Sequence, residues 1–94
     1  MAAIFIDTNV VLAANLLRGM GATEVFLFGS AAKGELRPGS DVDIAVTGLP
    51  PRVYFSAVSK ASAVVGRPVD LVELDDRTPL VDYLLRSGEL VRVQ

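Results

Sequence analysis

Cysteine and histidine are both absent from this 94-residue chain, and each absence removes a class of chemistry. Without cysteine, no disulfide, thiolate metal site or thiol nucleophile can form. Without histidine, there is no Ser-His-Asp triad, no imidazole zinc ligand and no histidine general base. Any catalysis must therefore use carboxylates, hydroxyls, lysine, arginine, tyrosine or backbone amides. Of these, carboxylates favour a hard cation such as Mg²⁺ or Mn²⁺.

A strong net charge and long apolar runs are also lacking. Nine basic and eleven acidic residues give a net charge of −2, so no global positive field attracts nucleic acid, and direct nucleic-acid binding is not expected. The longest apolar run, from Val10 to Leu17, is interrupted by Asn15 and is too short to span a bilayer. The N-terminus lacks the positively charged start of a signal peptide. We expect a cytoplasmic protein with no membrane association.

What the chain does have is apolar residues, which make up 51% of it, against 21% charged residues. This balance predicts a folded protein, and the length predicts one domain over residues 1–94. A core of this size cannot cover all of the apolar surface, so some of it is expected to remain exposed and to meet a partner.

Capping and breaking residues divide the chain into predicted elements. Helices are expected from Asp7 or Thr8 to about Arg18, from Pro50–Pro51 to Gly66, and from Thr78–Pro79 to Gly88. Strands are expected over residues 24–28, 41–47 and 69–74, with a short edge strand over 90–93. This pattern is typical of an α+β fold with helices packed on one small sheet.

Apolar residues almost surround the first predicted helix, which indicates burial on more than one side. We expect the first and third helices to present the surplus apolar surface to a helical partner or to a second copy of the chain. Leu84→Glu is then expected to disrupt that association, because burying an unpaired carboxylate is costly.

A glycine-rich stretch follows the first predicted strand and has the features of a phosphate-binding turn. Gly29 lets the backbone turn tightly, and the Ser30 hydroxyl and the following amides can bind phosphate oxygens, especially if residues 31–33 begin a short helix. Lys33 adds a positive charge nearby. Alone, however, a Gly-Ser pair after a strand is more often an ordinary turn.

Three acidic residues lie on two of the predicted strands. Asp41 and Asp43 are two residues apart, so their carboxylates should project from the same face, and Asp70 lies on the next strand along the chain. Such a group can hold two divalent ions about 3.5–4 Å apart. The alternative is a solvated strand face, because Val42, Ile44 and Val46 alternate with polar positions.

These residues together resemble the signature of the minimal nucleotidyltransferases in the DNA polymerase beta superfamily: Gly-Ser, ten residues, then Asp-x-Asp. Here Gly29-Ser30 and Asp41-Val42-Asp43 are separated by the ten residues 31–40, and Gly34 and Ser40 also match. Asp70 resembles the third acidic position of that family. Lys33 departs from the pattern, since many relatives have arginine there, which can grip a phosphate with two parallel hydrogen bonds.

The resemblance implies the nucleotidyltransferase fold, a small mixed sheet of three to four strands, and transfer of a nucleoside monophosphate from a triphosphate such as ATP to an acceptor hydroxyl. It assigns catalysis and Mg²⁺ or Mn²⁺ binding to three acids, and nucleotide binding to four further residues. The acids are Asp41, Asp43 and Asp70; the nucleotide-binding residues are Gly29, Ser30, Lys33 and Ser40.

The resemblance also implies a partner. Minimal nucleotidyltransferases are commonly paired with a small helical HEPN-domain protein, as antitoxin with toxin, and some transfer AMP to a tyrosine of that partner. With 94 residues leaving no room for an acceptor-binding domain, we expect such a partner to supply the acceptor. The alternative is a binding module that neutralises its partner by contact alone.

A second resemblance concerns residues 4–11 (IFIDTNVV), which look like the first strand of PIN-domain nucleases. That family needs further acids over a longer chain and has no place for the Gly-Ser motif. Asp7 as a helix cap is the preferred interpretation.

Overall fold

A four-stranded sheet with strand order β3-β2-β1-β4 organises the computed structural model, which describes residues 7–94. The strands are β1 (Glu24–Leu27), β2 (Val42–Thr47), β3 (Val69–Glu73) and β4 (Val91–Arg92). β1 pairs antiparallel with β2 and with β4, whereas β2 and β3 are parallel. The small mixed sheet expected from the sequence is confirmed, and each strand end lies within one residue of its predicted position.

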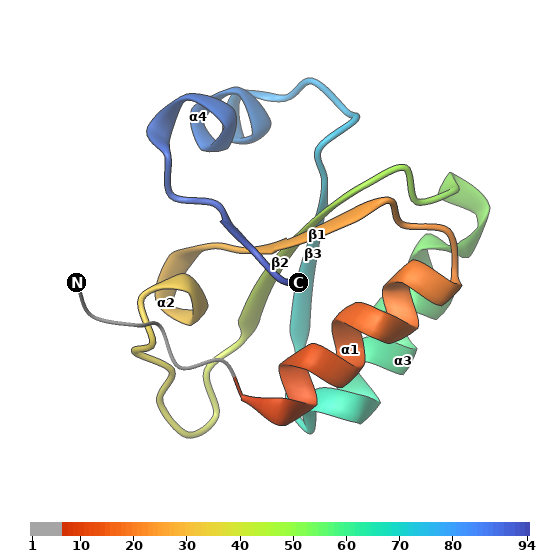
Figure 1. The fold of residues 1–94 in the computed structure, drawn as a ribbon, viewed down its shortest axis with the longest axis vertical. Coiled ribbons are helices and arrows are strands. Elements are labelled where there is room, and N and C mark those ends of the chain that lie inside the picture. Colours follow the sequence, from red (N-terminus) through yellow and green to blue (C-terminus); the bar gives the residue numbers. More distant parts are fainter. Residues whose placement is uncertain (1–6) are drawn as a thin grey trace.

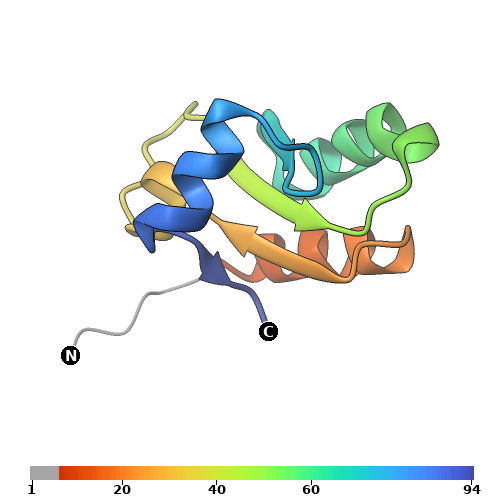
Figure 2. The same cartoon turned by 90° about the horizontal axis from the view of Figure 1, so that it is seen from above.

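Helices cover both faces of this sheet. α1 (Thr8–Gly19) and α3 (Tyr54–Val65) lie side by side against one face, and α4 (Pro79–Ser87) lies over the other (Figure 1). The short 3₁₀ helix η1 (Pro51–Val53) leads into α3. The short helix α2 (Gly29–Ala32) follows β1 and precedes β2 in the chain. A view from above shows the strands of the sheet passing between α4 and the α1–α3 pair (Figure 2).

Alternation along β2 assigns its side chains to the two faces. Val42, Ile44 and Val46 are fully buried in the cluster that α1 and α3 cover, whereas Ala45 belongs to a second cluster under α4. Because successive strand side chains point to opposite faces, Asp43 lies on the α4 face, next to Ala45. The core therefore anchors β2 from one side and directs its acidic side chain to the other.

α1 buries only one side. Asp7 caps it, its Oδ1 accepting a hydrogen bond from the Asn9 amide at 2.7 Å. The buried positions share the side that faces α3 and the sheet: Val10, Ala13, Ala14 and Leu17. Leu12, on the opposite side, is 51% exposed. The expectation of burial on more than one side was wrong, because α3 occupies the same sheet face and each helix presents a single stripe to the core.

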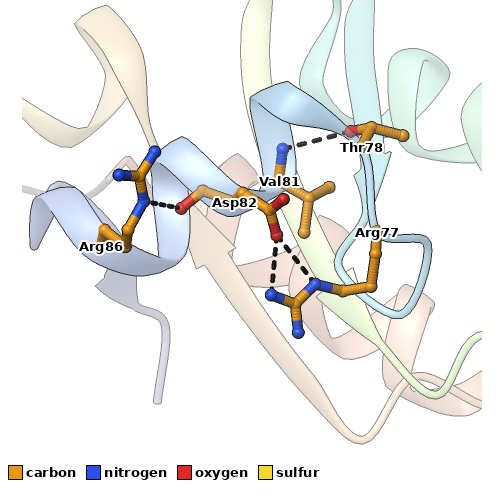
Figure 3. Close-up of polar contacts among 5 residues, drawn as sticks. All are labelled: Arg77, Thr78, Val81, Asp82 and Arg86. Atoms are coloured by element: carbon orange, nitrogen blue, oxygen red, sulfur yellow. Dashed lines mark hydrogen bonds and ion pairs between the residues drawn. The ribbon is translucent and has the colours of Figure 1, made fainter.

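Polar contacts fix the start of α4 (Figure 3). The Thr78 hydroxyl caps the helix by accepting from the Val81 amide at 3.2 Å. Arg77 donates from Nε and Nη2 to one carboxylate oxygen of Asp82, at 2.9 and 2.7 Å, and Arg86 Nε donates to the Asp82 carbonyl at 3.2 Å. The Thr78 and Arg77 contacts hold the turn after β3 against the first turn of the helix, whereas the Arg86 contact lies within the helix.

Leu84 is a core residue of α4. It is 3% exposed and packs with Val81 in the cluster on this sheet face, while Leu80, Tyr83 and Leu85 are about half exposed. Leu84→Glu would therefore place an unpaired carboxylate inside the core and unfold the protein. The expectation that Leu84 presents apolar surface to a partner was wrong, although exposed apolar side chains on α4 were correctly expected.

The PIN-type interpretation assigns a strand to residues 4–11. Of these, residues 8–11 form the first turn of α1, and residues 4–6 lie outside the described part of the chain. Among residues 7–94, no helix has the length and apolar character needed to cross a bilayer.

We predict that Asp7→Asn leaves the free energy of unfolding nearly unchanged, because asparagine caps a helix about as well as aspartate. Asp7→Ala removes the bond to the Asn9 amide and should cost about 0.5–2 kcal/mol. Urea unfolding followed by circular dichroism measures both values. Equal losses in the two variants would contradict the capping role.

Candidate functional site

Antiparallel pairing of β1 and β2 places the end of one strand beside the start of the other. Leu27 is opposite Ile44 in the register, and the next amide along, that of Phe28, donates to the Asp43 carbonyl at 3.2 Å. The glycine that follows Phe28 therefore lies beside Asp43. The two halves of the sequence motif meet here, although thirteen residues separate Gly29 from Asp43 in the chain.

Gly29 lies so close to the Asp43 side chain that a residue with a Cβ would require the carboxylate to shift. A Cβ atom on Gly29 would lie 3.4 Å from Asp43 Cγ and would overlap Oδ2. Gly29 also has a φ of +61°, in the region that residues with a Cβ rarely adopt. Both constraints favour glycine at this position.

The short helix expected near residues 31–33 is present, and it begins earlier, at Gly29. Ala31 and Ala32 are buried in the main core cluster and fix α2 against the sheet. In the part of the chain that the structure describes, no side chain caps the first turn of α2. Amides of a first turn have no partner within their own helix, so these donors are available to an anion.

The three candidate acids lie at one end of β2 and β3. Asp43 and Asp70 are direct partners in the parallel pairing, and Asp41 lies one residue before β2 begins. Asp43 is half-buried, whereas Asp41 and Asp70 are exposed. Burial raises the pKa of Asp43, and the negative charges of Asp70 and Asp41 raise it further. All three carboxylates are therefore close enough to interact electrostatically.

α4 leaves this acidic end of the sheet open. It covers Ala45 of β2 and Val72 of β3, which lie two residues further along each strand on the same face. At this end Asp70 is exposed, whereas Asp43 is half-buried beside Phe28, which also belongs to the cluster under α4.

The donor chemistry fits a hard divalent cation, although the side chains do not form a closed ligand set. Within residues 7–94, no group of three acidic residues has the arrangement of a metal site, and no ion pair neutralises Asp41, Asp43 or Asp70. Mg²⁺ in nucleotide-binding sites is typically held by one or two carboxylates together with substrate phosphates and water. The residues present fit an ion of that kind, and the assignment of all three acids as ligands stays a prediction.

The remaining predicted residues lie on and after α2. Ser30 is exposed in the first turn, and Lys33 is exposed where the helix ends. Neither side chain forms a hydrogen bond or ion pair with another described residue, so both can reach a ligand. Ser40 is half-buried, and its amide donates to the Arg37 carbonyl at 3.0 Å. Nucleotide binding by these residues stays a prediction.

One residue next to the site was not found from the sequence. Arg67 Nη1 donates to the carbonyl of Arg37 at 2.9 Å and to that of Ser40 at 3.4 Å. These carbonyls are 30 and 27 residues away in the chain, and main-chain acceptors leave no signature in a sequence. The one available signal is position: Arg67 comes three residues before Asp70.

We predict that Gly29→Ala destabilises the protein more than Gly34→Ala. Both glycines have positive φ, +61° and +68°, so each alanine should cost about 1–2 kcal/mol in backbone conformation. Only the Gly29 substitution also meets another side chain, since a Cβ on Gly34 has no neighbour within 4 Å. Overpacking against Asp43 should add about 1–3 kcal/mol. Chemical denaturation measures the two losses, and equal values would contradict the close approach.

The family comparison covers the whole candidate site. The sequence matches the family model described as polymerase beta nucleotidyltransferase over residues 16–93. This match spans well over half of the chain and includes every predicted site residue. No curated protein matches the chain in sequence.

Solved structures share this fold. A structure described as a minimal nucleotidyltransferase has 28% sequence identity and a TM-score of 0.72, with 87% of this chain and 86% of that one covered. A toxin-antitoxin crystal structure with AMP-PNP has 22% identity and a TM-score of 0.76, covering 94% and 73%. A complex from Shewanella oneidensis, a tri-AMPylated HEPN toxin with an MNT antitoxin, has 23% identity and a TM-score of 0.67, covering 92% and 69%. The sequence motif, the mixed sheet and the family match agree, and the chain belongs to the polymerase beta family of nucleotidyltransferases.

Proposed function

We propose that this protein transfers a nucleoside monophosphate, AMP from ATP, to a hydroxyl group of a partner protein in a reaction that depends on Mg²⁺ or Mn²⁺. We further propose that the partner is a HEPN-type toxin and that this chain is its antitoxin. The single observation that best supports this proposal is the contact between Gly29 and Asp43. It places the amides of the first turn of α2, which suit phosphate oxygens, beside a group of carboxylates, which suits a divalent cation.

Each part of the triphosphate then has a matching part of the site. The α2 amides, the Ser30 hydroxyl and the Lys33 ammonium group bind the outer phosphates. Asp41 and Asp43 hold the cation, which when bound offsets the negative charge that builds up on the phosphate oxygens. The acceptor oxygen forms a bond to the α-phosphorus, the bond between the α-phosphorus and the bridging oxygen breaks, and pyrophosphate leaves. Asp70, exposed beside Asp43, accepts the proton from the acceptor hydroxyl.

The acceptor is assigned to a partner because of where the site opens. Asp70 is exposed at the edge strand β3, so a hydroxyl carried by another protein can reach it. Two of the similar solved structures are toxin-antitoxin complexes, and one of these contains an AMPylated HEPN toxin. Their likeness supports a partner of the same kind for this chain.

A binding module that silences its partner by contact alone is the second candidate. It is favoured by five large apolar side chains that stay about half exposed or more: Leu12, Phe55, Leu80, Tyr83 and Leu85. Contact-only inhibition needs neither the metal nor the nucleotide. The two candidates therefore differ in what Asp43→Asn does to the partner.

We predict that Asp43→Asn abolishes the stabilisation that Mg²⁺ and ATP together give, while it raises the stability of the ligand-free protein at neutral pH. The raised pKa of Asp43 means that folding disfavours its charged form, so an uncharged amide removes an unfavourable interaction. Thermal melting with and without Mg²⁺-ATP measures both effects. Glu35→Gln, an exposed acid in the loop after α2, serves as the matched control. Equal ligand-induced shifts in wild type and Asp43→Asn would contradict the assignment.

We predict that wild-type protein, mixed with Mg²⁺, ATP labelled at the α-phosphate and its proposed HEPN-type partner, moves the label onto that partner. Asp43→Asn should abolish this transfer without preventing complex formation. Gel separation and mass spectrometry detect the added AMP. A partner that is silenced equally by wild type and by Asp43→Asn, and that stays unlabelled, would favour the contact-only module.

A further inference from the structure

The segment between the two halves of the motif has few contacts of its own. Residues 33–41 connect α2 to β2, and most of their side chains are exposed. Leu36 is half-buried against the main core cluster, and the Glu35 amide donates to the Ser30 carbonyl at 2.9 Å. Both of these contacts lie in the first half of the segment. The second half, which leads into Asp41, depends on a different element.

That element is the turn between α3 and β3. The half-buried side chain of Arg67 reaches across to the segment, and one nitrogen, Nη1, contacts two carbonyl oxygens. The Arg37 carbonyl, at 2.9 Å, also accepts from the Ser40 amide, so Arg67 holds a turn that is already closed on itself. The Ser40 carbonyl, at 3.4 Å, belongs to the peptide that leads directly into Asp41.

Pro68, the residue after Arg67, contacts the backbone that follows Asp41. The Pro68 carbonyl accepts from the Val42 amide at 2.9 Å, before β2 and β3 begin their regular pairing. Asp41 lies between these two contacts, and it is exposed, so the core does not fix it. Two adjacent residues, Arg67 and Pro68, thus contact the backbone on both sides of Asp41.

We propose that Arg67 is a positioning residue that fixes Asp41 relative to Asp43 and Asp70, and that nucleotide-metal binding depends on it. This inference rests on the proposed function of the site, because it assumes that Asp41 contributes to ligand binding. The same turn continues directly into β3, which supplies Asp70. One short segment therefore sets the positions of two of the three acids.

Arginine suits this role because its guanidinium group is planar, always charged and a donor at several fixed positions. Methionine has a similar length and apolar stem but no donor, so Arg67→Met removes the hydrogen bonds while retaining most of the packing. Lysine keeps the charge and can donate, and Arg67→Lys should therefore restore part of the effect. Arg52, an exposed arginine of η1 with no polar contact to the other described residues, provides Arg52→Met as the matched control.

The experiment has two independent measurements on the full chain. Amide hydrogen exchange, measured without metal or nucleotide, follows the Ser40 and Val42 amides. The Thr23 amide, bonded to the Thr47 carbonyl at 2.7 Å in another part of the fold, is the reference. Calorimetric titration then measures binding of Mg²⁺ with a non-hydrolysable ATP analogue. Thermal melting of each variant reports any general loss of stability.

We expect Arg67→Met to speed exchange at Ser40 and Val42, to leave Thr23 unchanged, and to weaken binding of the Mg²⁺-analogue probe by about tenfold or more. Arg67→Lys should lie between wild type and Arg67→Met in both measurements, and Arg52→Met should match wild type.

Unchanged exchange at Ser40 and Val42 in Arg67→Met would overturn the positioning role. Faster exchange with unaltered probe binding would show a purely structural contact and would overturn the proposed link to ligand binding. A wild-type protein that does not bind the probe would instead overturn the proposed function. In that case the exchange data still decide whether Arg67 orders the segment.

Discussion

The pairing of β1 with β2 places the backbone that follows β1, at Gly29, beside the Asp43 carboxylate near the start of β2. Register continues from Leu27 and Ile44 to the bond between the Phe28 amide and the Asp43 carbonyl, and the chain turns at the next residue, Gly29. A Cβ there would overlap the Asp43 carboxylate, so a larger residue at this turn would require that carboxylate to shift. The start of α2 and the acidic ends of β2 and β3 are thereby placed on one surface. The rest of the site depends on this close approach.

The same arrangement brings three acidic side chains together, and among the described residues no basic side chain forms an ion pair with them. Burial together with the charges of Asp70 and Asp41 raises the pKa of Asp43, and no ion pair among the described residues neutralises the three acids. The opposite face of the sheet offsets this cost, since Val42 and Ile44 of the same strand are fully buried beneath α1 and α3. Local instability on one face is tolerated because the other face is well packed. A cation that binds there would reduce the repulsion between the carboxylates.

Sequence patterns predicted the parts of this protein that local rules control. Alternation in residues 42–46 indicated which side of β2 is buried, and Thr78 and Gly88 marked the ends of α4. The ten-residue spacing of the motif predicted the family, which the family match confirms.

Sequence patterns failed where packing between distant segments determines which residues are buried. Apolar residues around α1 could not indicate which side meets α3, and nothing local distinguished buried Leu84 from exposed Leu85. Arg67 was missed because its partners are distant carbonyl oxygens.

A double-mutant cycle on the unfolding free energy measures whether Gly29 and Asp43 lie as close together as the structure places them. Asp43→Ala removes the carboxylate that a Cβ at residue 29 would meet, so Gly29→Ala should cost less in that background than in wild type. We expect a coupling energy of about 1–3 kcal/mol, with the remaining cost of Gly29→Ala reflecting its positive φ alone. Losses that add within about 0.5 kcal/mol would show that the two residues do not meet.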